Sequence, residues 1–397
     1  MAVDNRTARR LVPLGMIFLT VGLSTAFIGP FLSLFLSTAV HAGPVRIAAF
    51  LFLAPLASVT VSTLIGRFSD RRPIRRGLLV LAASAGCVGS AATAFVRDYW
   101  LLLALTFTAN AVAGSLFPQV FAYAREVLQG SSRAAMTMST LRMLFSIAWV
   151  AGPPLATLLL TAGGFRLLYG ASAVLYALAA FTGLRWLGPS TPVTAASRAP
   201  RGRLQPDVLV AVTALTLMTC AGFMGVQSMS LFVTNDLHGS VRDAGLILGL
   251  CAGIEIPLML GFGALSTRFS LHRLILTGSL LGLAYYVLAT LATHSWELAA
   301  EQSLNACFIA AASGLGVSYI QELLPTRPGQ AATLFSNAYP IGGMIAGPLL
   351  GLAQHFGFRL AYAMSAALCL CGFALLLAVR RPRAVAPEMT PVEAVVA

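Results

Sequence analysis

The sequence contains no lysine, and charged residues of all kinds make up only 10% of its 397 positions. Soluble domains carry about 25% charged residues, so the charges present here are too few to cover a water-soluble surface. Hydrophobic residues, in contrast, make up 58% of the chain. Most of the chain must therefore be in contact with lipid rather than water.

Motifs of metal and hydrolytic chemistry are also absent. The motif H-E-x-x-H does not occur, and the six cysteines form no C-x-x-C pair. The five histidines fall in loops or near the ends of apolar runs, which leaves no imidazole for metal binding or proton relay inside the membrane. We therefore expect no cofactor, no bound metal and no enzymatic activity.

Apolar runs of about 20 residues recur along the chain, and each is long enough to cross a hydrocarbon core about 30 Å thick. Backbone polar groups in lipid must be paired within their own segment, which favours helices. The runs predict an all-α membrane protein with twelve transmembrane helices. These lie near residues 11–38, 45–66, 77–96, 99–126, 134–162, 164–187, 207–235, 241–266, 274–293, 297–323, 331–355 and 358–380.

The distribution of arginine predicts the topology. All 26 basic residues are arginine, and Arg142 lies inside a predicted helix. With the N-terminus inside, the outside loops hold only Arg46, Arg97, Arg166, Arg242 and Arg359. This positive-inside pattern predicts a multi-pass protein of the cytoplasmic membrane with both termini in the cytoplasm. It also accounts for the net charge of +13 without a nucleic-acid partner.

Two stretches of the chain, 151–173 and 346–366, are near copies of each other. Gly164-Phe165-Arg166 in the first returns as Gly357-Phe358-Arg359 in the second, and Ser33-Leu34-Phe35 returns as Ser230-Leu231-Phe232. Such matches occur in the same order in both halves of the chain, which indicates an internal duplication. We expect a six-helix bundle over residues 1–187, a flexible cytoplasmic linker over 188–206, a second six-helix bundle over 207–383 and a disordered tail over 384–397.

An even number of helices in each half gives both halves the same orientation, as in the major facilitator architecture. The loop "GRFSDRRPIRRG" resembles the signature of that superfamily, although Pro73 stands where a glycine is usual and the basic pair comes one residue late. The resemblance implies a cytoplasmic gate. Its residues would be Gly66, Asp70, Arg71, Arg75 and Arg76.

Longer stretches narrow the resemblance. "FPQVFAYARE", "LRMLFSIAWVAGPPLA", "AGIEIPLML" and "QELLPTRPGQAATLFSN" are similar to the sugar efflux transporter family of the superfamily. This likeness covers most of the chain and implies a monomeric protein that exports sugars or glycosides in exchange for protons. Multidrug efflux by the same fold is an alternative, as is proton-coupled uptake, because substrate choice is not written in these motifs.

Four amides are candidates for contact with a hydroxyl-bearing substrate, because amides both donate and accept hydrogen bonds. Asn110 and Asn305 occupy matching positions in the two halves, so we expect them to face each other across the central axis; Gln227 and Gln302 would join them. The alternative for each is a hydrogen bond between packed helices.

Charged groups inside the predicted helices are few and costly, at roughly 2.5–3.5 kcal/mol each at a helix centre. We expect Arg142 of the fifth helix and Glu255 of the eighth to form a buried pair between the halves. When the pair opens, Glu255 would take up a proton and couple protonation to transport. The alternative is a static pair that holds the halves in register.

Overall fold

The computed structural model describes residues 5–69, 74–128, 134–188 and 204–379. Every element in these ranges is helical. In chain order they are α1 (Asn5–Ile28), the 3₁₀ helix η1 (Gly29–Phe31), α2 (Leu32–Thr38), α3 (Pro44–Ser69), α4 (Arg75–Phe95), α5 (Tyr99–Leu105), the π-helix η2 (Thr106–Asn110), α6 (Ala111–Ala113), α7 (Leu116–Val127), α8 (Ala134–Trp186), α9 (Pro206–Asn235), α10 (Val241–Leu265), α11 (Leu271–Leu291), α12 (Ser295–Ala300), α13 (Gln302–Leu323), α14 (Pro328–Phe356) and α15 (Phe358–Ala378).

Ten helical segments in the described residues are long and apolar enough to cross a membrane. One of them, Thr140–Trp186, contains a sharp bend and makes two passes. The 29-residue α14 is not among these ten but is long enough for a further pass. Together they give the twelve passes expected, because a membrane helix needs about 20 residues.

The bends that end the fifth and eleventh passes use matching glycines. Gly164 lies inside α8 with φ of 63°, and Gly357 separates α14 from α15 with φ of 111°. Side chains with a Cβ rarely adopt such φ values, whereas glycine does so readily. The repeated Gly-Phe-Arg of the sequence is therefore a repeated turn in the structure.

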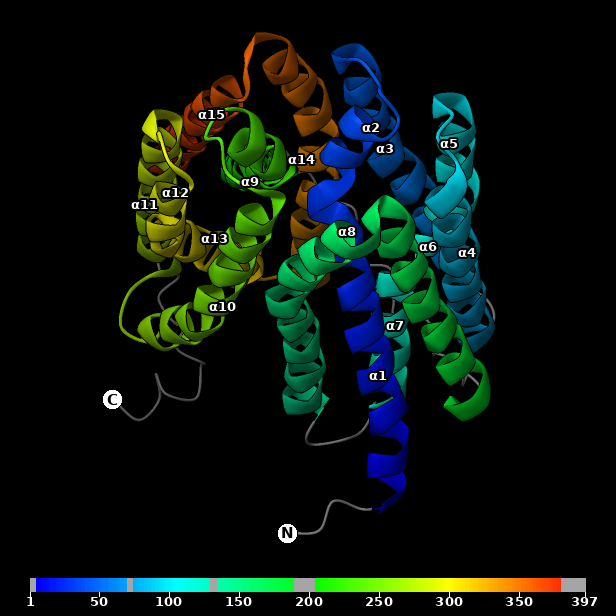
Figure 1. Cartoon of the computed structure of the whole chain (residues 1–397). Helices are drawn as coiled ribbons and strands as arrows, with labels where there is room; N and C mark the ends of the chain where they lie inside the picture. Colours follow the sequence, from blue (N-terminus) through cyan, green and yellow to red (C-terminus); the bar gives the residue numbers. More distant parts are fainter. Residues whose placement is uncertain (1–4, 70–73, 129–133, 189–203, 380–397) are drawn as a thin grey trace, which may run out of the picture.

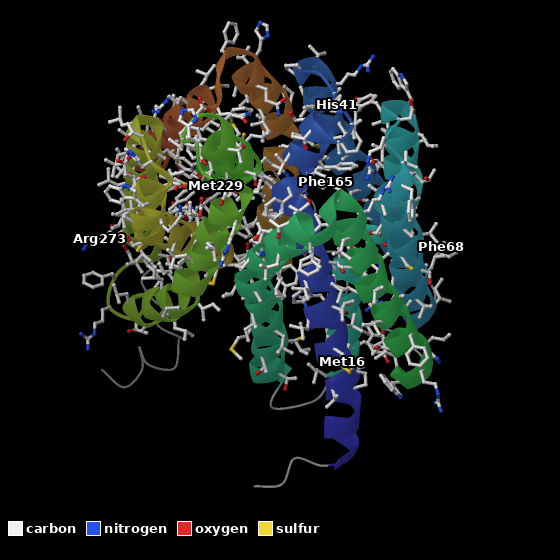
Figure 2. The ribbon with its side chains drawn as sticks, viewed as in Figure 1. Met16, His41, Phe68, Phe165, Met229 and Arg273 are labelled. Carbon is white, nitrogen blue, oxygen red and sulfur yellow. The ribbon has the colours of Figure 1, made fainter. Side chains whose placement is uncertain are left out.

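The loops after the first and seventh passes also match in detail. His41 and His238 both have positive φ, at 55° and 52°. Before them, the carbonyl oxygens of Phe35 and Phe232 each accept two backbone hydrogen bonds from the residues that follow the helix. The two halves of the chain thus repeat at the level of single turns. Figure 2 places His41 at the top of the view and Met16, on the same pass, near the bottom.

We call the end of the bundle that carries His41 and His238 the apical end, and the end at which α1 and α9 begin the basal end. Figure 1 shows the apical end at its top and the beginning of α1 at its bottom. The first half comprises α1 to α8, and the second half comprises α9 to α15.

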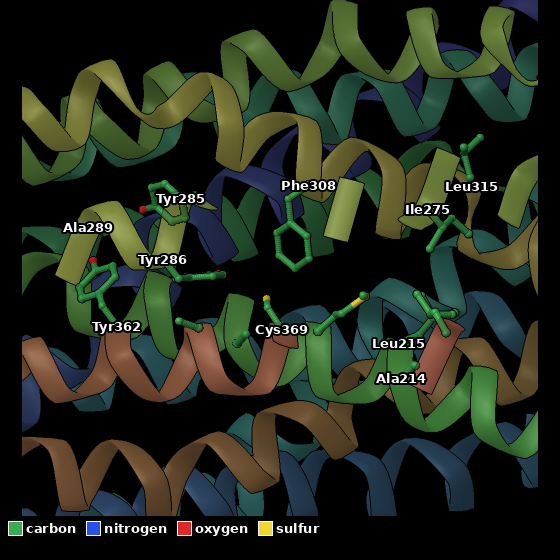
Figure 3. Close-up of a cluster of buried hydrophobic side chains, with 14 of the residues drawn as sticks. Ala214, Leu215, Ile275, Tyr285, Tyr286, Ala289, Phe308, Leu315, Tyr362 and Cys369 are labelled. Carbon is green, nitrogen blue, oxygen red and sulfur yellow. The ribbon is translucent and has the colours of Figure 1, made fainter. Parts of the chain in front are cut away.

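Each half has a hydrophobic core of its own. Tyr285, Tyr286, Phe308 and Tyr362 lie in the core of the second half, which contains no residue before Leu204 (Figure 3). In the first half, the basal core lies between Leu14 and Leu187 and contains no residue of the second half. Each half therefore has a core that the other half does not enter.

Apical side chains, in contrast, pack across the two halves. One apical cluster joins Phe35, Ile47 and Phe50 of the first half to Met224 and Ala346 of the second. A second cluster adds Leu231 to first-half residues of α1, η1, α2 and α8. We call the first of these the apical plug. The described halves are thus sealed together at the apical end, while the basal cores remain separate.

Glycines allow the helices to approach closely at this seal. A Cβ on Gly249 of α10 would lie 2.9 Å from the Val150 carbonyl oxygen of α8. On the other seam, a Cβ on Gly347 of α14 would lie 2.7 Å from the Phe52 backbone nitrogen of α3. Real Cβ atoms do not come so close to backbone atoms, so only glycine fits without a shift.

Candidate functional site

Three polar side chains lie near one another at mid-membrane, between the halves. Arg142 belongs to the first arm of α8, Glu255 to α10 and Tyr339 to α14. The charge of Arg142 acts on Glu255, and the charge of Glu255 acts on the Tyr339 phenol. Each lies roughly 12–17 Å from the basal end of its helix, at 1.5 Å per residue. The two halves therefore both contribute to this site.

The buried ion pair expected from Arg142 and Glu255 is not formed in this structure. Their helices do pack as expected, because Gly249 of α10 lies against Val150 and Pro154 of α8. The described residues nevertheless form no Arg142–Glu255 ion pair within 4.0 Å, and Arg142 is exposed. Both charges lie basal to the helix contact, so their distance depends on how far the halves part there.

Tyr339 is an aromatic residue that the sequence reading passed over. It is 59% exposed although it lies near the middle of a pass. Its ring lies 4.6 Å from that of Phe223 in α9, at an interplanar angle of 58°. Ala346, seven residues and therefore about two turns further along α14, is buried in the apical plug. Tyr339 thus lies on the side of α14 that faces the first half, at a level where the halves no longer pack.

Trp149 was also passed over. It lies about two turns apical of Arg142 on the same side of α8, and a Cβ on Gly29 would lie 3.8 Å from its ring. Its Nε1 atom is buried and has no hydrogen-bond partner in the described chain. A buried donor without a partner costs about 1–3 kcal/mol, so such a group requires an explanation. The sequence alone does not distinguish a tryptophan that lies between the halves from one that faces lipid.

Gln302 and Asn305 are buried within the second half. Asn305 Nδ2 donates to Gln302 Oε1 at 3.0 Å and to Cys251 Sγ of α10 at 3.4 Å. Gln302 Nε2 donates to the Tyr285 hydroxyl at 3.2 Å and to the Leu298 carbonyl at 2.9 Å. The bonds to Cys251 of α10 and Tyr285 of α11 are the helix-to-helix alternative, whereas the other two lie within one pass. Asn305 Oδ1 is the exception, because it is buried without a partner in the described residues.

Asn110 does not face Asn305 across the axis. A Cβ on Gly89 of α4 would lie 2.2 Å from Asn110 Oδ1, so the amide occupies the space that this glycine leaves. Asn110 ends the π-helix η2, in which the extra residue of a wider turn changes the direction of the side chains that follow. The expected symmetric pair of asparagines is therefore not seen, and a role of either in substrate binding stays a prediction.

Gln227 joins the two halves. Its Oε1 accepts a hydrogen bond of 3.0 Å from Ser33 Oγ of α2. This bond lies next to the apical clusters, since Leu34 and Leu231 belong to one of them. In this conformation, Gln227 therefore helps to close the apical end.

The expected gate is described in part. Asp70 and Arg71 lie outside the described residues. Arg75 donates to the Ala122 carbonyl at 3.3 Å and lies 3.8 Å from Glu126, and Arg76 donates to the Gly183 and Leu184 carbonyls. A Cβ on Gly66 would meet nothing within 4 Å. The basic pair is thus tied to the basal ends of passes four and six of its own half.

Comparison with known proteins shows similarity along the whole chain. The sequence profile of the Major Facilitator Superfamily matches residues 14–232 and 209–395. A putative sugar efflux transporter of Deinococcus radiodurans is 38% identical over 381 residues, which are 92% of this chain and 97% of the relative. Sugar efflux transporter A of Dickeya chrysanthemi is 36% identical over 384 residues, with the same coverage of 92% and 97%.

Solved structures agree with the fold. A mutant of the nucleoside transporter NupG superposes with a TM-score of 0.80, over 94% of this chain and 100% of that one. The identity is only 12%, so this likeness concerns the arrangement of the helices and not the substrate.

Proposed function

Because the chain belongs to the major facilitator superfamily and, within it, to the sugar efflux transporter family, we propose that it exports sugars or glycosides across the cytoplasmic membrane. The chain is a transporter rather than an enzyme. We further propose that export is driven by protons moving inward and that the basal end, which carries most of the arginines, faces the cytoplasm.

The observation that carries this proposal is the site between halves whose described residues share hydrophobic clusters at the apical end, whereas their basal cores are separate. A transporter of this kind needs a central site that opens to each side in turn. Arg142 from the first half and Glu255 from the second both lie at mid-membrane, basal to the seal. The conformation described here would then accept substrate from the cytoplasm.

Glu255 is proposed as the proton-binding residue. A carboxylate at mid-membrane is costly unless it is protonated or paired. In this conformation Arg142 acts on it from beyond 4.0 Å, so its charge is only partly balanced. Inward proton movement requires that Glu255 takes up a proton from outside while the apical end is open, and that substrate entering this basally open conformation displaces the proton to the cytoplasm. A static ion pair without a coupling role remains the alternative.

Substrate contacts are proposed for Asn110, Asn305, Gln227 and Gln302. Asn305 is the best placed, because its Oδ1 has no partner in the described chain and can accept from a hydroxyl. Gln227 would be freed for substrate when the bond to Ser33 breaks on apical opening. The signature loop from Gly66 to Arg76, with Asp70 and Arg71, is proposed as the basal gate.

The test is transport by the purified protein in sealed proteoliposomes. A radiolabelled glycoside should accumulate inside when the lumen is acidic, because inward solute movement is then exchanged for outward protons. Glu255→Gln should abolish this accumulation yet retain exchange of labelled for unlabelled glycoside. Glu301→Gln, at the apical end of another pass, is the matched control. Accumulation by the Glu255→Gln protein would contradict the coupling role.

Multidrug efflux is the second candidate. The observation in its favour is a pair of partly buried phenyl rings, Phe117 and Phe121, whose centroids lie 4.7 Å apart beside the basal core of the first half. Such rings suit flat apolar drugs better than sugars. Accumulation of tetraphenylphosphonium but of no glycoside in the same vesicles would favour this function instead.

A further inference from the structure

Phe223 and Tyr339 form an aromatic surface at mid-membrane that neither the family resemblance nor the proton-coupling hypothesis explains. Phe223 is partly buried and packs against the apical plug, whereas Tyr339 is 59% exposed. Their ring centroids are 4.6 Å apart. The two rings therefore form one aromatic surface that extends from the apical plug toward the basal end.

Two glycines of α14 allow close contact with the Phe223 ring and with α9. A Cβ on Gly343 would lie 3.4 Å from the Phe223 ring, so the ring lies directly on the helix at that position. A Cβ on the neighbouring Gly342 would lie 2.9 Å from the Cys220 backbone nitrogen, so α9 and α14 are in close contact there. The position of the Phe223 ring is thus set by two helices in contact rather than by a loop.

Exposure of Tyr339 is not explained by lipid. Lipid-facing residues of α14 lie on the opposite side from Ala346 and Leu350, which are buried in the apical plug. Tyr339 lies on their side, about two and three turns basal of them. Its phenol also lies within electrostatic reach of Glu255 on α10, which no lipid-facing side chain of α14 would be. The exposed ring therefore faces the site between the halves.

A pyranose ring suits this combination of groups. Its two faces carry C–H bonds and are weakly apolar, and its rim carries hydroxyls. An aromatic face attracts the C–H bonds through its negative quadrupole, while a carboxylate accepts from hydroxyls. We infer that the Phe223–Tyr339 pair is the surface on which the ring of the sugar stacks, with Glu255 accepting from its hydroxyl rim. This inference rests on the proposed function, because it names the part of the substrate that the site recognises.

The inference predicts a preference for cyclic over open-chain substrates. Methyl glucoside presents a flat pyranose face, whereas sorbitol has similar hydroxyls but no ring. The purified protein in proteoliposomes should exchange labelled methyl glucoside, and unlabelled sorbitol should compete about two- to tenfold more weakly than unlabelled methyl glucoside. The preference is measured as the inhibition constant of sorbitol divided by that of methyl glucoside. This ratio does not depend on how much active protein each preparation contains.

Tyr339→Leu and Phe223→Leu should each bring this ratio close to one and raise the KM for methyl glucoside about two- to tenfold. Tyr339→Phe, which keeps the ring, should restore most of the preference. Phe356→Leu is the matched control, since Phe356 is 69% exposed at the far end of the same helix. Its ratio should equal that of the unmodified protein.

Two results would overturn the inference, and they differ from each other. If the unmodified protein exchanges methyl glucoside but the Leu variants keep its preference over sorbitol, the stacking surface is wrong and sugar export stands. If the unmodified protein transports tetraphenylphosphonium and no glycoside, the proposed function fails and the inference fails with it. Thermal unfolding of each purified variant shows whether it is folded. If one of the two Leu variants is unfolded, the preference of the other tests the inference.

Discussion

Substitution of Gly249 by alanine should open the apical end of the protein. The added Cβ would lie 2.6 Å from Pro154 Cγ and 2.9 Å from the Val150 carbonyl oxygen. Neither a proline ring nor a backbone carbonyl within a helix can move aside easily. The clash exists only while α8 and α10 are packed, so it penalises the apically closed conformation and leaves the open one untouched.

The expected size follows from overpacking. An extra carbon in a closely packed contact costs about 1–3 kcal/mol. A cost of that size in one conformation shifts the equilibrium between the two by roughly 5- to 150-fold. A protein that is apically closed in most molecules would then populate the apically open state to a measurable extent.

Spin labels can measure this shift directly. Val45 of α3 and Phe356 of α14 are 82% and 69% exposed at the apical end, one in each half, so labels there disturb little. In a background without native cysteines, Gly249→Ala should add a population with a longer distance between the labels. Gly261→Ala is the control on the same helix, because a Cβ on Gly261 meets nothing within 4 Å. Equal distance distributions in the two variants would refute the reasoning.

Three further results are expected. Ser33→Ala should increase the population with the longer spin-label distance, relative to the closed one, by about three- to tenfold. The substitution removes the hydrogen bond to Gln227, which contributes about 0.5–1.5 kcal/mol to the closed state. Burial raises the pKa of the Asp236 carboxyl at the apical end, although Arg359 opposes this. A raised folded-state pKa means that the unmodified protein loses stability as pH rises from about 4 through that pKa, so its melting temperature in detergent should fall more steeply over this range than that of Asp236→Asn. Asn110→Ala and Asn305→Ala should each weaken glycoside binding about tenfold in equilibrium titrations if these amides contact substrate.

The passes and the duplication are predictable because they depend on composition and order alone. A continuous apolar run of about 20 residues crosses lipid as a helix, because a barrel strand would be shorter and would alternate, and the segments that cross the membrane can therefore be read from the sequence. The paired turns at Gly164 and Gly357 follow likewise from a residue type that tolerates positive φ. These features require no knowledge of what each helix contacts.

The candidate site was harder to predict because it depends on the direction in which each side chain points. Asn110 and Asn305 occupy matching positions in the sequence, yet the π-helix that ends at Asn110 has no counterpart in α13. Tyr339 and Trp149 carry no sequence signal, because aromatic residues in apolar runs are equally common against lipid. The Arg142–Glu255 distance depends on conformation, which a sequence does not state.

The sequence repeat also gives a wrong structural match for one arginine. Arg359 lies in the first turn of α15, 5.8 Å over the Phe232 ring, and donates to the Thr290 carbonyl at the end of α11. The sequence repeat assigns Arg166 to the matching place in the first half. There, however, Arg97 lies 5.3 Å over the Phe35 ring and donates to the Thr93 carbonyl at the end of α4.

A cation at this place is favourable whichever segment supplies it, because the last carbonyls of a helix lack partners and carry partial negative charge. Both halves therefore place an arginine at the end of the matching helix, but the arginine comes from a different position in the chain in each half. The same reasoning applies to the site between the halves. Arg142 and Glu255 have no charged counterparts at the matching places of the other half, so the charges at mid-membrane are asymmetric although the helices are not. A symmetric scaffold can rock between two equivalent arrangements, and an asymmetric pair of charges gives the two arrangements different affinities for a proton.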